Sequence, residues 1–428
     1  MAITEDRDTW SLGKRLLYLG FLCVFSLAFF YLTRDNPFWN PGDFLYLNQA
    51  IDIGESAAEI LTVAPKQPFQ PLVNLVFHIE YSLFGLHAWK YYLFNVFIHS
   101  LNAFLVATLV FVLLKDRVIA VVSSLLFACA VGNYGKAVMV VSGVSDLLIT
   151  LLTLLTLFFY FKNQLECGGK ILSKWFLIGA ICFVLSVMTK TTSFVILGCM
   201  LAFAVFFRTE TKRPVFSPPL LVFAVIALTA LLVKFALGFE VAAQHDFVFG
   251  PFGFLKNYAS YLVRMVFPIH TSTLVRHAGP VVYSIYEAAD AIRLLVFITI
   301  VSFSLFGFVF GNRTLRFFIA WTYITVTPFC FFEFPKYATD WLDIRHLYLV
   351  SVGFSMVLAS VTVLASRLLW RHRWRRALPY TLPLAFVVLS QFIIYQLDTK
   401  YELTAEIPEI RKMAEEVRIR HEASQRGE

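Results

Sequence analysis

The sequence predicts an all-α polytopic membrane protein with about eleven membrane-spanning helices, and three observations predict this class. Hydrophobic residues make up 59% of the 428 residues, and charged residues only 15%, against roughly a quarter in soluble domains. The mean hydropathy is +0.72. Apolar runs of about 18 residues or more, each with few charges, recur along the chain, and such runs are typical of transmembrane helices. A soluble fold is excluded.

The apolar runs place the elements in order. Each run is long enough for a helix and ends at a cluster of charged, Gly or Pro residues. We predict spans near 16–33, 91–114, 118–133, 146–161, 175–189, 192–207, 219–237, 294–311, 317–333, 347–366 and 379–396.

The connections between these spans predict their orientation. With a cytoplasmic N-terminus, 18 of the 36 Lys and Arg residues fall in short inside segments, the densest being SRLLWRHRWRRA at 366–377. Cytoplasmic loops are enriched in Lys and Arg. The net charge of +8 therefore indicates membrane orientation rather than nucleic-acid binding. We expect the N-terminus inside and the C-terminus outside.

Two external segments are long and differ in charge. Residues 34–90 are acidic and contain a helix-like stretch, PLVNLVFHIEYSLFG. Residues 238–293 contain GPFGFLKNYASYLVRMVFP, which is aromatic and basic, and we interpret it as an interfacial or re-entrant helix. We therefore divide the chain into a transmembrane domain, 1–396, and an external tail, 397–428. In the tail, Ile407, Ile410, Ala414 and Val417 recur at helical spacing, as in an amphipathic helix that lies on the membrane or docks a partner. The alternative is a frayed terminus.

An acid stands among aromatic residues where the first span ends. The stretch NPFWNPGDFLYLN, 36–48, surrounds Asp43 with Phe and Trp side chains. Such a carboxylate can act as general base toward an acceptor hydroxyl, and burial would raise its pKa toward a useful range. The alternative is an N-cap for a helix that begins near Phe44, which spacing alone favours. Asp35 is the second candidate for a catalytic acid. Its alternative interpretation, which is favoured, is a solvated residue in a turn before Asn-Pro.

Polar side chains also recur inside the second predicted span. Asn95, His99 and Asn102 are spaced by four and three residues and share one helix face. Polar residues inside a membrane usually face neighbouring helices and hydrogen-bond to them. Helix packing is the first interpretation, and contact with a substrate is the second.

Several cations lie at predicted outer helix ends, where they are expected to be fewer. Lys190 and Arg345 stand in tight turns, and a lipid phosphate or diphosphate is a natural partner for them. The alternative is a side chain that reaches the headgroup layer. This alternative is favoured for the remaining outer cations, Lys136, Lys256 and Arg264.

The sequence contains none of the common soluble-enzyme motifs. No Gly-rich phosphate loop, HExxH motif or nucleotide fingerprint occurs, and no Cys or His spacing indicates a metal site. We therefore expect a donor borne by a lipid. Whether a divalent metal takes part stays open.

Four segments resemble the GT-C glycosyltransferases, and most of all their O-mannosyltransferase-like, tetratricopeptide-associated branch. They are QPFQPLVNLVFHIEYSLFGLHAWKYYLFNVFIHSLNAFLVATLV (67–110), VSGVSDLLITLLTLLTLFFY (141–160), VLSVMTKTTSFVILGCML (184–201) and IRHLYLVSVGFSMVLA (344–359).

The resemblance implies a fold, an activity and site residues. Members have many spans and a long first external loop that carries an acidic catalytic residue. They transfer a sugar from a polyprenyl-phosphate donor to an acceptor hydroxyl, usually with inversion. Asp43 then takes the role of general base, Lys190 and Arg345, with His346 beside it, suit the donor phosphate, and His99 and Asn102 match a polar pair of the second span.

The chain also departs from the family pattern. Gly42 stands where a second acid is common, Gln70 replaces an Arg, Val350 replaces a Pro, and no tetratricopeptide array follows the last span. A second hypothesis is therefore a catalytically silent subunit that holds a partner through its tail. A transporter is the weaker third, since no inverted repeat is evident. The compact chain favours the inner membrane of a bacterium over a eukaryotic endoplasmic reticulum.

Overall fold

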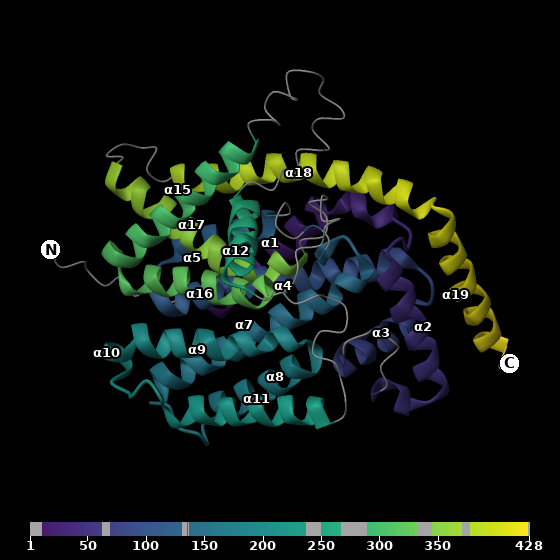
Figure 1. Cartoon of the computed structure of the whole chain (residues 1–428), viewed down its shortest axis with the longest axis horizontal. Helices are drawn as coiled ribbons and strands as arrows, with labels where there is room; N and C mark the ends of the chain where they lie inside the picture. Colours follow the sequence, from purple (N-terminus) through teal and green to yellow (C-terminus); the bar gives the residue numbers. More distant parts are fainter. Residues whose placement is uncertain are drawn as a thin grey trace.

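The computed structural model describes residues 11–61, 69–130, 135, 137–236, 250–266, 289–331, 345–369 and 377–426. Over these residues the chain is helical and contains no strand (Figure 1). The predicted all-α class is confirmed.

A helix overlaps every predicted span. The eleven helices are α1 (Leu12–Phe29), α4 (Ala88–Leu114), α5 (Arg117–Cys129), α7 (Val144–Glu166), α8 (Lys174–Thr189), α9 (Val195–Phe206), α11 (Pro218–Ala236), α15 (Ala289–Phe310), α16 (Arg313–Cys330), α17 (Leu347–Leu369) and α18 (Leu378–Ala405).

Not all of these helices are equally suited to cross a membrane. Six of the described helices are long and apolar enough, namely α1, α4, α7, α11, α17 and α18, and four more are apolar but shorter, namely α5, α8, α9 and α15. Helix α16 belongs to neither group. These helices identify the chain as a membrane protein. The number of eleven crossings stays a prediction.

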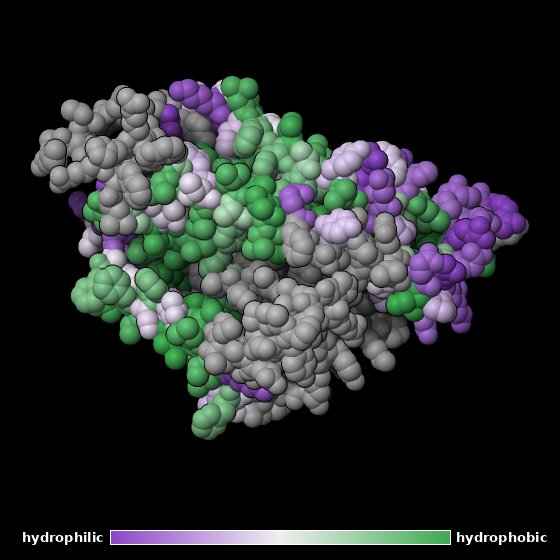
Figure 2. Space-filling model, turned by 90° about the horizontal axis from the view of Figure 1, so that it is seen from above, coloured by the Kyte–Doolittle hydropathy of each residue, from purple (hydrophilic) through white to green (hydrophobic). Residues whose placement is uncertain are grey.

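The bundle has a buried centre and an apolar outside. In the apolar windows of α4, α7 and α17, 61%, 78% and 67% of the residues are buried, against only 17% in α1 and 28% in α11. The outer helices expose large aliphatic side chains, such as Leu17 and Val225. Figure 2 shows hydrophobic side chains over much of one face and hydrophilic ones gathered at the end that bears the last helix. A surface of this kind suits lipid.

The two ends of the bundle differ. At one end the basic turns meet: Arg367 at the end of α17 pairs with Asp116, the N-cap of α5, at 2.6 Å, and Arg313 pairs with Glu210 in the short helix α10 (Arg208–Thr211). At the other end lie α2 (Pro41–Glu55), α3 (Pro71–Phe84) and α19 (Pro408–Arg426) (Figure 1).

The two helices predicted in the external segments are present as α3 and α12 (Pro251–Val266). The apolar face of α12, with Tyr261, Leu262 and Met265, packs on residues of α16 and α17 that include Val326 and Val350. Val350 therefore occupies a buried contact at the position where the resemblance has Pro.

The tail differs from its prediction in two respects. Helix α18 runs through the predicted boundary at residue 397 and ends at Ala405. The next helix, α19, packs on α2 of the same chain. Ile410 and Val417 are buried there, whereas Ile407 and Ala414, which the helical pattern also placed on the apolar face, are exposed.

Candidate active site

Asp43 lies in the first turn of α2, and the local sequence explains why the helix begins there. Asn40 is the N-cap and its side chain accepts from the Gly42 amide at 2.9 Å, while Asp43 accepts from the Asn40 amide at 3.3 Å. Pro41 at the first helical position has no amide hydrogen to satisfy. This reciprocal pair is a capping box. The expectation that Asp43 itself is the N-cap of a helix beginning near Phe44 was wrong by three residues.

The second carboxylate oxygen of Asp43 contacts a distant segment. It accepts from the Ser142 amide at 2.7 Å, in the 3₁₀ turn η3 (Val141–Gly143) that leads directly into α7. Asp43 is fully buried, 0% exposed, next to buried Trp39 and Phe44. Burial raises the pKa of Asp43 to about 6, although the hydrogen bonds from Ser142 and Asn40 oppose the rise. A carboxyl with such a pKa can exchange a proton near neutral pH.

The packing of α2 on η3 also explains the glycine beside Asp43. A Cβ at Gly42 would lie 3.1 Å from both Asn40 Oδ1 and Ser142 Oγ. The position where the resembling family often has a second acid is therefore too close to η3 for a side chain to fit without movement.

A second carboxylate, Asp146, lies one helical turn beyond Ser142 in the first turn of α7. Its Oδ1 is 2.5 Å from Lys190 Nζ, and its Oδ2 is 3.8 Å from Arg345 Nε. Lys190 is the C-cap of α8, and Arg345 immediately precedes α17. The structure thus brings the two predicted cations together on a buried acid.

The cluster carries one more positive than negative side chain. Asp146 pairs with both cations, and its side chain is 8% exposed, whereas the side chain of Arg345 remains 37% exposed. The His346 ring stacks on Phe329 at 5.0 Å between ring centroids. An exposed guanidinium held by a buried carboxylate can bind a singly charged phosphodiester by donating two hydrogen bonds to its oxygens.

A third cation, Lys234, lies close to the turn that bears Lys190. It is buried in the last turn of α11, and its Nζ donates to the Val187 carbonyl at 3.1 Å and lies 3.5 Å from Thr191 Oγ1. Val187 lies in the last turn of α8, where the helix dipole favours a cation. Lys234 therefore holds the segment that presents Lys190.

The polar residues of the second predicted span are buried in α4 and hydrogen-bond to neighbouring helices. Asn95 donates to the Val140 carbonyl at 2.9 Å and Asn102 to the Leu147 carbonyl at 3.0 Å. The ring nitrogens of His99 lie 2.8 Å from the Tyr348 hydroxyl and 3.2 Å from the Ala128 carbonyl. These bonds join α4 to the segments around α5, α7 and α17. Contact of these residues with a substrate stays a prediction.

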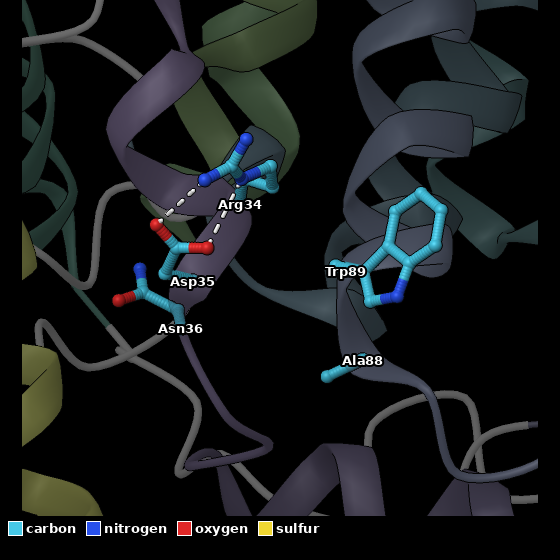
Figure 3. Close-up of a pocket in the computed structure, with 5 residues that line it drawn as sticks. All are labelled: Arg34, Asp35, Asn36, Ala88 and Trp89. Atoms are coloured by element: carbon cyan, nitrogen blue, oxygen red, sulfur yellow. Dashed lines mark hydrogen bonds and ion pairs between the residues drawn. The ribbon is translucent and has the colours of Figure 1, made fainter.

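Asp35, the second catalytic candidate, lies on the surface. It is paired with Arg34 through contacts of 3.0 and 3.2 Å, and its side chain is 74% exposed. Both residues line an open pocket of about 550 Å³, with Asn36 on the same side and Ala88 and Trp89 of α4 opposite (Figure 3). Within the described residues, the contacts of Asp35 are with Arg34 and those of Asp43 are with Asn40 and Ser142, so the two carboxylates are not linked.

Comparison with known proteins gives a fold but no sequence family. No family model matches the chain, and no curated protein matches it. Among solved structures, the apo oligosaccharyltransferase of Archaeoglobus fulgidus matches with a TM-score of 0.53 at 13% identity, over 96% of this chain and 60% of that one. The chain therefore shares the fold of this oligosaccharyltransferase, as the resemblance implied. The predicted O-mannosyltransferase-like branch stays a prediction.

Two further solved structures match with lower TM-scores. ArnT from Cupriavidus metallidurans, bound to undecaprenyl phosphate, has a TM-score of 0.46 at 14% identity over 95% of this chain and 75% of ArnT. AglB from A. fulgidus, in complex with an inhibitory peptide and a dolichol-phosphate, has a TM-score of 0.49 at 14% identity over 93% of this chain and 56% of AglB. The chain spans 60% of the length of the oligosaccharyltransferase that it matches first.

Within the described part of the chain, no three His, Cys, Asp or Glu side chains converge as metal ligands would. Lys136, another predicted outer cation, lies outside the described residues. Lys256 and Arg264 both lie on α12.

Two residues of the site escaped the sequence analysis. Asp146 was within a segment used for the resemblance, and Lys234 was within a predicted span. Each lies beside a long apolar run of its helix, and an ionisable residue at such a place marks a candidate site. That signal would have found both.

Proposed function

We propose that the protein is an integral-membrane glycosyltransferase that moves a sugar from a polyprenyl-phosphate donor to an acceptor hydroxyl. One observation carries the proposal: the Lys190–Asp146–Arg345 cluster begins one helical turn from the residue that holds Asp43. Cations for a leaving phosphate and a carboxyl of raised pKa thus lie at one end of a GT-C bundle. The fold it shares with an oligosaccharyltransferase adds support.

The proposed reaction divides between the two carboxylates. Asp43 takes the proton of the acceptor hydroxyl as its oxygen bonds to the anomeric carbon. The bond from that carbon to the phosphate oxygen breaks on the opposite face, so the configuration inverts. Its electron pair leaves with the polyprenyl phosphate, and Arg345 and Lys190 stabilise the charge that develops there.

Asp146 serves this reaction indirectly. Two cations could not lie side by side in a partly buried site cheaply without a counter-ion, and Asp146 offsets the repulsion between Lys190 and Arg345. It leaves a net positive charge for the donor phosphate. His346 is placed beside Arg345 and completes the predicted donor set.

The orientation belongs to the same proposal. The basic turns around Arg313 and Arg367 gather at the end opposite to α2, and basic turns face the cytoplasm. We place the site on the periplasmic side of a bacterial inner membrane, with the N-terminus inside and the C-terminus outside.

One observation favours a second function, that of a silent subunit which holds a partner. Both oxygens of Asp43 accept backbone hydrogen bonds, as a purely structural carboxylate would, and the side chain is fully buried. If Asp43 only fixes α2 to η3, the fold can persist without chemistry.

The test uses purified protein in lipid nanodiscs with a panel of radiolabelled polyprenyl-phosphate hexoses and envelope extracts as acceptors. We expect one donor to release polyprenyl phosphate and label an acceptor, and Asp43→Asn to lower that rate at least about 100-fold, as loss of a general base does. Glu55→Gln, an exposed change on the same helix, is the matched control. Transfer by Asp43→Asn at the wild-type rate would refute the proposed chemistry.

A further inference from the structure

The last two helices, α18 and α19, connect two parts of the molecule. Helix α18 is anchored in the bundle, where Gln391 donates to the Phe29 carbonyl at 3.0 Å and Ser390 bonds to the Cys129 carbonyl. After a short turn, α19 bends across the end of the bundle and runs beside α2 (Figure 1). The pair α18–α19 therefore joins the bundle to the external helices.

Helix α19 contacts α2 through a buried face and through one arginine. Val417 is buried at 2% exposed, and Ile410 joins the same core. Arg420 donates from Nη1 to Asn48 Oδ1 at 2.9 Å and from Nη2 to Asp52. Asn48 and Asp52 are four residues apart and so lie on one face of α2. One planar guanidinium thus hydrogen-bonds to residues in two successive turns of α2, which fixes the rotation of that helix as well as its position.

The neighbouring residue extends the contact to α3. His421 Nδ1 lies 2.5 Å from the Tyr81 hydroxyl, and the two rings meet edge to face at 5.5 Å. The outward face of α19 instead carries exposed local pairs, such as Arg418 with Glu415 at 2.7 Å. Only one face of the helix is therefore used for docking.

The other end of α2 carries Asp43. Its carboxylate is held by Asn40 and by the Ser142 amide. Asp52 lies nine residues further on, about 13 Å along the helix axis. Since α2 is one unbroken helix of 15 residues, rotation at one end moves the other.

We infer that Arg420 is a positioning residue for Asp43: by fixing the far turns of α2 it fixes the carboxyl at the near end against η3. This inference rests on the proposed function for its catalytic meaning. It also assigns the tail a task within this chain, where the sequence suggested a membrane or a partner.

The test measures hydrogen exchange of the Ser142 amide, whose bond to Asp43 Oδ1 reports directly on that carboxyl. In Arg420→Ala we expect exchange at Ser142 to rise about tenfold. Transfer should lose kcat several-fold with an unchanged donor KM, because Lys190 and Arg345 do not lie on α2. In Arg420→Lys, the Ser142 exchange rate and kcat should lie between those of the wild type and Arg420→Ala, because an ammonium cannot hold both Asn48 and Asp52. Arg418→Ala, on the exposed face, is the control and should match the wild type.

Swapping the charges of Arg420 and Asp52 distinguishes loss of their contact from general misfolding. Arg420→Asp should raise Ser142 exchange, and the double variant Arg420→Asp, Asp52→Arg should restore most of the protection. The inference would be overturned if, in Arg420→Ala, the amides of α19 exchanged freely while the Ser142 amide still exchanged at the wild-type rate. Should the wild type transfer no sugar, the proposed function fails alone, because the exchange experiment still decides whether α19 positions Asp43.

Discussion

The amide of Ser142 donates a hydrogen bond of 2.7 Å to Asp43, 99 residues earlier in the chain. This bond joins α2 to the turn that leads into α7, and α7 carries Asp146 with its two cations. The base and the donor-binding cluster of the proposed reaction are therefore built on one junction.

The first prediction concerns the pH dependence of transfer. Burial raises the pKa of Asp43 to about 6, and only the ionised carboxylate can accept a proton. The rate should therefore fall as pH drops, with a midpoint near 6 in kcat/KM. A pH–rate series in nanodiscs measures it, and a midpoint near 4 would show that a solvated carboxylate is the base.

The same group predicts how stability depends on pH. The folded pKa of about 6 exceeds the unfolded value of about 3.9, so the ionised form is disfavoured in the fold. The contribution of Asp43 to stability is present below pH 4 and is lost as pH rises through 6, by about 3 kcal/mol. Comparing the pH dependence of thermal unfolding in wild type and Asp43→Asn isolates this contribution. Parallel curves from pH 4 to 7 would contradict it.

The second set of predictions concerns Lys190 and Asp146. Lys190→Met leaves the buried carboxylate of Asp146 with Arg345 alone at 3.8 Å, and loss of one partner of a buried pair costs about 3–5 kcal/mol. The double variant Lys190→Met, Asp146→Leu removes both charges and should recover most of this stability without recovering transfer. Thermal unfolding and donor KM are the measurements. A double variant as unstable as the single one would show that the pair is not a unit.

Gly42 gives a prediction about the fit of α2 against η3. The Cβ of Gly42→Ala would lie 3.1 Å from Asn40 Oδ1 and Ser142 Oγ, so the capping box must shift, and a lost cap costs about 1 kcal/mol. Ser142 exchange should rise and transfer should slow. Gly20→Ala in α1, where nothing lies within 4 Å, is the matched control and should leave both unchanged. Equal behaviour of the two variants would mean that the junction tolerates movement.

Tyr348 tests the packing role of the polar face of α4. Its hydroxyl lies 2.8 Å from His99 and accepts from Asn102 at 3.1 Å. Tyr348→Phe removes that partner, and an unsatisfied buried polar group costs about 1–3 kcal/mol. We expect lower thermal stability with an unchanged donor KM. A raised donor KM at normal stability would instead place His99 and Asn102 in the substrate pocket.

The helices were predictable from the sequence because apolar periodicity and capping residues act locally. The predicted first span, 16–33, was displaced by four residues relative to α1, because the apolar run continues through Tyr31 and Leu32 into a 3₁₀ turn after the helix ends. The span predicted at 379–396 agrees with the apolar part of α18, 378–395, but the helix continues through polar residues to Ala405.

The site was only partly predictable. Lys190 and Arg345 were selected because each is a cation in a turn, and the structure brings them together. Their shared partner Asp146 lies 44 residues from Lys190 and about 200 from Arg345, and no local pattern specifies such a pairing. The docking of Arg420 on Asp52, 368 residues apart, escaped for the same reason.

The central claim is that Asp43 is a catalytic base rather than a cap alone. It is tested most directly by mass spectrometry of glycolipids and envelope glycoproteins from cells that carry the wild type, Asp43→Asn or no copy. If the claim holds, Asp43→Asn matches the deletion and loses one defined sugar at a normal level of folded protein. Glycans of wild-type composition in Asp43→Asn cells would contradict it and leave the carboxylate as the clasp between α2 and η3.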